Sequence, residues 1–332
     1  MTDQTSLPAA ASNRARNLYT LLIFAALVLV MIVVTVSAYL RLAGSGLGCT
    51  EWPACYALIQ SRDGTTTLAA AHLVPPWATV THRLAASTLG LLVLGIVASA
   101  LRRRREPEQS LAIPFALLAL TVFLSLLGYR TPSPLMPWVA LSNLLGGMAM
   151  LAMLWWLGSR SVSAGVASDA ARRLRPWAFA GMVVVFLQIA LGGWVSANFA
   201  ALACTNFPGC GNFPWLDGPW RESFNLARTL PVTDGGAVIV GDTGKIIHLA
   251  HRVGALVTFL YIGWLGWRAL VPGAPTRSTG VAMLTLLALQ ILVGIWAVAS
   301  GLPLIVVALH NGVAALLLLS VVNLFHLLTP KT

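Results

Sequence analysis

The chain has 332 residues, of which 58% are hydrophobic and only 9% are charged. A soluble globular domain carries about 25% charged residues, so this composition, with a mean hydropathy of +0.81, excludes the soluble classes. The net charge of +11 does not indicate nucleic acid as a partner, because the basic residues cluster at the ends of apolar runs, where they report membrane topology. We therefore expect an integral membrane protein surrounded by lipid.

Eight apolar runs are long enough to be transmembrane helices, since about 20 apolar residues cross the hydrocarbon core. They cover residues 18–40, 76–101, 111–129, 137–158, 176–198, 246–270, 278–300 and 303–328. The first run follows Arg14 and Arg16, is too long for a signal peptide and lacks a small-residue cleavage site, so we expect it to be retained. The sequence thus predicts an all-α integral membrane protein with eight transmembrane helices.

The basic residues predict how these helices are oriented. They gather in the connections after the second, fourth and sixth runs and after the eighth, at Arg102 to Arg105, Arg172, Arg173, Arg175, Arg268, Arg277 and Lys331. All of these lie on the side of the N-terminus, which the positive-inside rule makes cytoplasmic. Both termini are then cytoplasmic, and the loops 41–75 and 199–245 face outward.

Four cysteines lie in these two outer loops, as the pairs Cys49/Cys55 and Cys204/Cys210. Five residues with Pro or Gly separate the members of each pair, so each segment can fold back into a local disulfide, and disulfides persist in an oxidising compartment. A four-cysteine zinc site is the alternative, but such sites favour spacings of two to four residues. Structural and redox roles both remain open.

The sequence repeats its own organisation. Each half has a helix, an outer loop with a cysteine pair, a helix that opens with His-Arg, and two further helices. His82 precedes Asn143 by 61 residues, and His251 precedes His310 by 59. We predict two tandem four-helix bundles, at 1–165 and 166–332, related by a pseudo-twofold axis along the membrane normal.

Two histidines of the second half lie inside apolar runs, where an ionisable side chain is a functional-site hypothesis by default. His251 lies five residues into the sixth run and His310 seven into the eighth, about 7–11 Å below the outer ends of their helices. Imidazoles at matching depth on facing helices are typical of a bis-histidine haem in a bundle core. The alternative is a buried histidine that hydrogen-bonds to a neighbouring helix.

Other polar residues near these histidines have two interpretations each. His248, one turn before His251, either lines the edge of the haem or faces water. Arg83 and Arg252 follow the two helix-opening histidines, and each either pairs with a haem propionate or extends to the outer interface. His326 lies near the cytoplasmic end, where we expect a structural role.

Several motifs together resemble the haem A synthase family over nearly the whole chain. They are Leu40-Arg41-Leu42-Ala43-Gly44-Ser45-Gly46-Leu47-Gly48-Cys49, Trp52-Pro53 before Cys55, Leu191-Gly192-Gly193-Trp194-Val195-Ser196-Ala197-Asn198, the segment from Cys204 to Cys210, Ile247-His248-Leu249-Ala250-His251-Arg252 and Leu309-His310-Asn311-Gly312.

The resemblance implies a bacterial inner-membrane oxidoreductase that converts haem O to haem A by oxidising a ring methyl to a formyl group. It implies a haem b between His251 and His310, and substrate haem O in the first half between His82 and position 143. The first cysteine pair would have a functional role beyond a structural one. The haem O synthase would be a partner, while the electron-transfer partner and a homo-oligomer are left open.

Two positions depart from the family pattern. Thr79 stands three residues before His82 where the family usually has a glutamate, and Asn143 stands where it has the second histidine of the first half. With His82, these form the predicted catalytic set, in which His82 holds a five-coordinate substrate haem and leaves its other face open. The alternative function is a non-catalytic b-type cytochrome or assembly factor derived from that family. A transporter built on tandem repeats is a weaker one, because no matched pair of interrupted helices is present.

Overall fold

The computed structural model describes residues 6–47, 49–62, 65–106, 110–129, 134–162, 169–206, 209–211, 213–271 and 274–330. Among these residues, eight helices are long and apolar enough to cross a membrane, which confirms the predicted fold class. They are α1 (Ser6–Gly44), α2 (Pro76–Arg102), α3 (Ala112–Tyr129), α4 (Pro137–Val162), α6 (Arg175–Ala197), α8 (Gly241–Ala269), α9 (Ala274–Ala299) and α10 (Leu304–Leu327).

The helices begin where the sequence provides an N-terminal proline. Pro76 and Pro137 are the first residues of α2 and α4, and Pro303 directly precedes α10. Proline suits this position because its fixed φ is helical and the first N–H has no partner within the helix. The α8 helix differs from the prediction: it begins at Gly241 rather than at residue 246, and an ion pair of 2.8 Å between Asp242 and Lys245 supports the additional turn.

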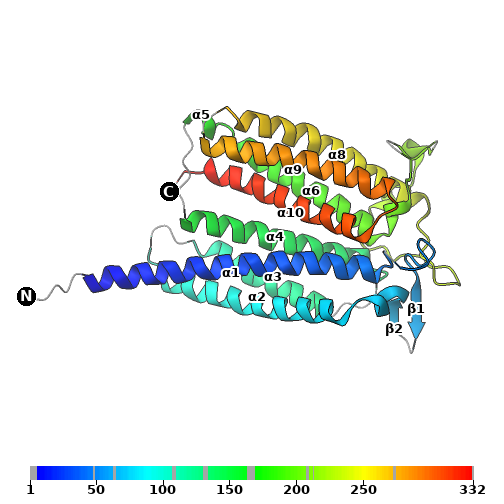
Figure 1. The fold of residues 1–332 in the computed structure, drawn as a ribbon, viewed down its shortest axis with the longest axis horizontal. Helices are drawn as coiled ribbons and strands as arrows, with labels where there is room; N and C mark the ends of the chain where they lie inside the picture. The colour runs from blue at the N-terminus through cyan, green and yellow to red at the C-terminus, as the bar shows by residue number, and fades with distance from the viewer. Residues whose placement is uncertain are drawn as a thin grey trace, which may run out of the picture.

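The long helices form two groups, α1 to α4 and α6 with α8 to α10 (Figure 1). The groups share one continuous buried cluster that runs from Ile23 in α1 through Met148 in α4 to Leu318 in α10. Contacts of α4 with α6 and α10, and of α1 with α10, join them. These contacts show which helices are neighbours but do not test a symmetry between the two groups. The two tandem bundles and their pseudo-twofold relation therefore remain predictions.

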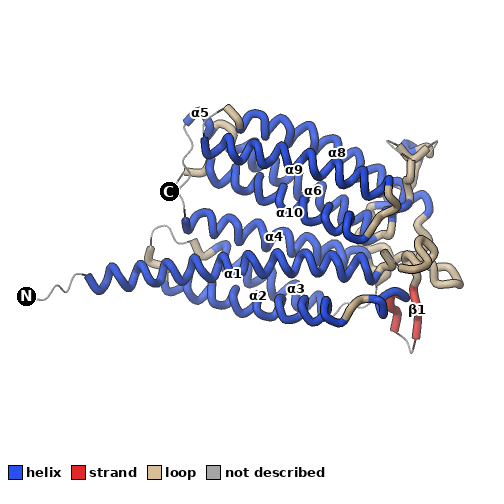
Figure 2. The backbone as a smooth tube through the Cα atoms, viewed as in Figure 1, coloured by secondary structure: helices blue, strands red, loops and turns tan. Residues whose placement is uncertain are grey.

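The connections at one end of the bundle are short and at the other end elaborate. Helix α1 begins and α10 ends at the same end, opposite the hairpin of β1 (Ile59–Arg62) and β2 (Thr65–Leu68) (Figures 1 and 2). The strands are antiparallel, with Ile59 opposite Leu68. The sequence patterns did not predict this hairpin. Short helices complete the connections: η1 (Ala69–Leu73), α5 (Asp169–Arg172), η2 (Ala200–Leu202), η3 (Trp215–Asp217) and α7 (Trp220–Ser223).

The two long loops of the hairpin end contact each other. The Ile59 N–H donates to the carbonyl of Gly236 at 2.8 Å, and the Val238 N–H donates to the carbonyl of Ala57 at 3.2 Å. Backbone hydrogen bonds therefore join the two loops, so the two helix groups are connected at the hairpin end as well as through their shared core.

At the other end, an arginine predicted to mark topology also has structural contacts. Arg103 donates to both carboxylate oxygens of Glu106, at 2.6 to 3.1 Å, and its guanidinium lies 4.9 Å from the centre of the Tyr19 ring. These hydrogen bonds hold the pKa of Glu106 below its usual value. Arg103 thus ties the end of α2 to α1.

Candidate functional site

The ring of His251 lies against helix α6. Gln188 Nε2 is 3.1 Å from His251 Nδ1 and also donates to the His251 carbonyl at 3.1 Å. A Cβ placed at Gly192, one turn after Gln188, would be 3.0 Å from His251 Cε1. The glycine therefore leaves room for the ring, and the glutamine fixes its plane through Nδ1, which leaves Nε2 for another partner.

The fit between α6 and α8 is reciprocal. A Cβ at Gly254 of α8 would collide with Gln188 Oε1, just as one at Gly192 of α6 would press on the His251 ring. Gln188 Oε1 is buried and accepts no hydrogen bond. The amide is thus held between Gly254 and His251 with one acceptor atom unused.

The ring of His310 is held by the same kind of pair on α9. Gln290 Nε2 lies 3.1 Å from His310 Nε2, and a Cβ at Gly294 would be 2.8 Å from His310 Cε1. The other ring nitrogen, Nδ1, is buried and has no hydrogen-bond partner. A buried polar atom without a partner costs about 1–3 kcal/mol, and each histidine site has at least one: Gln188 Oε1 beside His251, and Nδ1 of His310 itself.

The structure brings these two histidines together at the centre of the second group of helices. Both α8, which carries His251, and α10, which carries His310, pack against α6 and α9. Among the described residues, no group of three or more His, Cys, Asp and Glu side chains could hold a metal ion.

The two glutamines that contact the histidine rings, and the role of the two glycines beneath the rings, were not predicted from the sequence. The available signal was Gln-x3-Gly, which occurs as Gln188 to Gly192 in α6 and as Gln290 to Gly294 in α9. The first half lacks both copies: aligned on the shared Val-Ser-Ala and Leu-Leu-Ala-Leu segments, its corresponding residues are Leu29 and Val33 in α1 and Thr121 and Ser125 in α3. The two halves thus differ at the residues that hold the rings.

The predicted catalytic residues of the first half lie on neighbouring helices. His82 and Thr79 belong to α2 and Asn143 to α4, and both helices pack against α1. All three residues are partly buried. Their side chains form no hydrogen bond in the part of the chain that the structure describes, so their catalytic grouping stays a prediction.

Two further histidines have structural environments. His248 is only 4% exposed, and its Nδ1–H donates to the Ala200 carbonyl of η2 at 3.1 Å. It does not face water, which contradicts one of its two interpretations. His326 is 3% exposed and meets the Trp156 ring edge-on, with centroids 5.8 Å apart, as its expected structural role requires.

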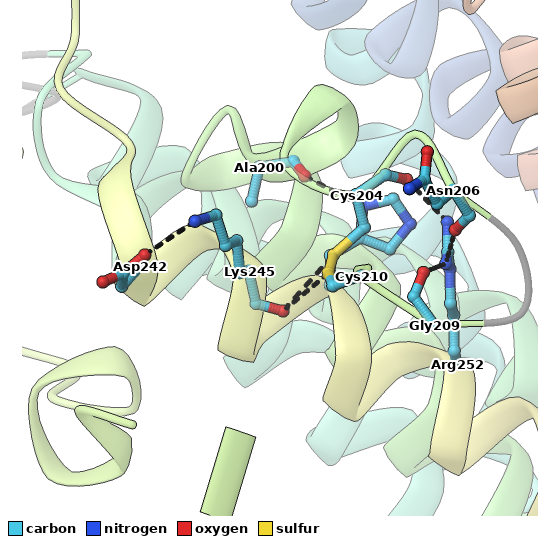
Figure 3. Close-up of a disulfide and its surroundings, with 9 residues drawn as sticks. Ala200, Cys204, Asn206, Gly209, Cys210, Asp242, Lys245 and Arg252 are labelled. Carbon is cyan, nitrogen blue, oxygen red and sulfur yellow. Dashed lines mark hydrogen bonds and ion pairs between the residues drawn. A yellow bond between two sulfur atoms is a disulfide. The ribbon is translucent and has the colours of Figure 1, made fainter. Parts of the chain in front are cut away.

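Arg252 binds the second cysteine loop (Figure 3). Its Nη1 donates to the carbonyls of Asn206 and Gly209, and its Nη2 donates to that of Cys204, each at 2.6 Å. Arg83, by contrast, is exposed. The expectation that Arg252 pairs with a propionate remains untested, but the protein's own carbonyls already accept three of its N–H groups.

The Cys204–Cys210 and Cys49–Cys55 disulfides are both formed, as predicted. The sulfur atoms of the Cys204–Cys210 bridge lie 3.7 and 3.9 Å from the Lys245 carbonyl at the start of α8. Gly46, with φ of 99°, permits the first loop to return: a Cβ there would be 2.5 Å from the Cys55 carbonyl oxygen. Each bridge therefore closes its loop against the end of a long helix.

A groove of about 740 Å³ lies beside His251 on the outside of α6 and α8, under the second cysteine loop. Exposed apolar side chains such as Leu187, Val253 and Val257 line it, and Gln188 forms part of its wall. Gln188 therefore separates the His251 ring from a surface that faces lipid.

These features define a multi-pass membrane protein with two buried histidines in one helix group and two disulfide-closed loops at one end of the bundle. Residues 20–322 match the model of the COX15-CtaA family, described as cytochrome oxidase assembly protein. The chain is 35% identical over 324 residues to a heme A synthase of Shewanella oneidensis, covering 92% of this chain and 95% of that protein. It is also 26% identical to a heme A synthase of Sphingopyxis alaskensis, covering 93% and 92%. The chain belongs to the COX15-CtaA family.

The contacts of Arg252 predict how the second disulfide responds to substitution. Arg252→Met removes the donors to three loop carbonyls, so we expect dithiothreitol to reduce Cys204–Cys210 several-fold faster. Timed maleimide labelling followed by peptide mass analysis measures this rate, with Cys49–Cys55 as the internal control. Equal acceleration of both bridges, or of neither, would contradict a specific clamp.

Proposed function

We propose that this protein is a membrane oxidoreductase that oxidises a ring methyl of haem O to the formyl group of haem A. The observation that carries the proposal is the similarity to a heme A synthase over 92% of the chain at 35% identity. The relatives are bacterial, so we place the protein in the bacterial inner membrane. The arginine distribution supports cytoplasmic termini and outward-facing cysteine loops.

The second half fits a resident haem b held by His251 and His310. Two imidazoles on facing helices are a common axial ligand set, and Gly192 and Gly294 leave room for their rings. When bound there, a haem supplies one-electron transfer. An imidazole whose Nε2 held a metal would carry its proton on Nδ1. Gln188 would accept that N–H once its amide turned to bring Oε1, which has no partner, to the place of Nε2.

Substrate haem O would bind in the first half, with His82 as its protein ligand. Asn143 is a weaker iron ligand than imidazole, so the face of the substrate toward Asn143 and Thr79 is left accessible. Neither residue carries a carboxylate, and proton transfer to or from the reacting methyl must therefore use water or another group. Oxidation of the methyl group needs an external electron acceptor, and a haem held by His251 and His310 would supply one-electron transfer toward it.

The proposed reaction is tested by haem extraction from cells that express the protein together with a haem O source. We expect haem A to accumulate, identified by mass, and the mutation His82→Ala to abolish it. Haem B as the protein's only haem, with haem O unconsumed, would instead identify a non-catalytic b-type cytochrome.

The ligand assignment predicts a spectroscopic change. His310→Ala and His251→Ala each remove one axial imidazole, so we expect both to abolish the low-spin absorption of the purified protein. His326→Ala is the control, because that ring lies on α10 like His310 but packs against Trp156 of α4. A low-spin spectrum that survives the loss of His310 would show that the ligand is another residue.

The close approach of Gly294 to the His310 ring leads to a further prediction, about haem content. Gly294→Ala places a methyl 2.8 Å from His310 Cε1, which must turn or displace the ring, so we expect haem content to fall several-fold. Gly312→Ala is the matched control on α10, because a Cβ there meets nothing within 4 Å. Pyridine haemochrome assays measure both, and equal haem content would argue against a ring held on Gly294.

A further inference from the structure

Arg41 lies on the buried side of helix α1. Val34, Ala38 and Leu42 form the buried stripe of this segment, with 8%, 3% and 4% of their surfaces exposed. Arg41 is seven residues after Val34, which is two helical turns, and so it points in nearly the same direction. A cation therefore occupies a stripe that otherwise packs against other helices.

The guanidinium of partly buried Arg41 lacks a partner at two of its three nitrogens. Its Nε and Nη2 atoms are buried and form no hydrogen bond. Arg103 and Arg228 each have one such nitrogen but bond through others, to Glu106 and Thr243, and Arg252 donates to three carbonyls. An unpaired charge inside a membrane bundle is costly, so a cation held this way indicates a missing anion.

The packing of α1 against α4 places Arg41 close to the depth of the predicted substrate site in the helix bundle. A Cβ at Gly147 of α4 would be 3.0 Å from Val34 Cγ2, which aligns these two residues. Toward the cysteine loops, Asn143 lies four residues from Gly147 and Arg41 seven from Val34. At 1.5 Å per residue, Arg41 is about one turn nearer these loops than Asn143.

We propose that Arg41 binds a carboxylate of the tetrapyrrole substrate, which rests on the proposed binding of haem O beside His82. The macrocycle carries two propionates, and a guanidinium meets a carboxylate with two parallel hydrogen bonds. Nε and Nη2, the two unpartnered donors, form one such edge of the guanidinium. Arg41 thus takes the role that the sequence suggested for Arg83 and Arg252.

The proposed role predicts that Arg41 contributes to ligand binding and not to the stability of the fold. If Arg41 supported the fold, Arg41→Met would lower the melting temperature. If it is held for a ligand, the same substitution removes an uncompensated buried charge, and the melting temperature without added haem stays the same or rises. Methionine is chosen because it keeps the apolar stem of the side chain.

The experiment titrates purified holoprotein, already loaded with its resident haem, with haemin and with haemin dimethyl ester, followed by difference absorption. His82→Ala identifies the signal that belongs to the first-half site. We expect the wild-type protein to bind the free acid about tenfold or more tightly than the ester, the size of a charge-assisted hydrogen bond. Arg41→Met should remove this preference without weakening the ester, while Arg83→Met, which tests the arginine that the sequence suggested for this role, should leave the preference in place.

Three results would overturn the proposal: a preference for the free acid that survives Arg41→Met, an equal loss of affinity for both ligands, or a preference that disappears only in Arg83→Met. A titration unaffected by His82→Ala would instead show that the proposed substrate site is wrong. The failures of the two proposals are therefore distinguishable.

Discussion

The second helix group depends on two imidazole rings that lie on glycines of neighbouring helices. At Gly192 and Gly294 the absence of a side chain lets His251 and His310 lie against the backbone of α6 and α9. A glutamine one turn earlier on the same helix then contacts one nitrogen of each ring. Ring position and ring orientation are thus set by the helix next to the one that carries the histidine.

The two rings are held through different nitrogens. Gln188 contacts Nδ1 of His251 and Gln290 contacts Nε2 of His310. Nε2 of His251 is therefore outside the contact with Gln188, whereas Nδ1 is the ring nitrogen of His310 that has no partner. The amide can adapt because it offers both a donor and an acceptor, and Gln290 Oε1 has no partner. His251 and His310 therefore each have a Gln-x3-Gly partner on the neighbouring helix but differ in the ring nitrogen that the glutamine contacts.

The arginines of the protein also differ in the partners that they contact. Arg252 stabilises the second cysteine loop by three backbone carbonyls, and Arg103 joins α2 to α1 through Glu106 and Tyr19. These cations have protein partners and so belong to the architecture. Arg41 has none for two of its nitrogens, which is why it, rather than the arginines beside the histidines, is the candidate for a substrate carboxylate.

The sequence by itself determined the eight helices, both disulfides and the family, because hydropathy, cysteine spacing and motifs are local properties of the chain. It also singled out His251 and His310 by their polarity within apolar runs. Only the tertiary structure decided which side chains surround them. In the sequence, Gln188 and Gln290 are isolated polar residues, and only the packing of α6 and α9 beside α8 and α10 brings them to the histidines. Arg41 and Arg252 likewise cannot be told apart in the sequence, but in the structure Arg252 donates to three carbonyls and Arg41 to none. Such pairings depend on distances between segments far apart in sequence, which no local pattern encodes.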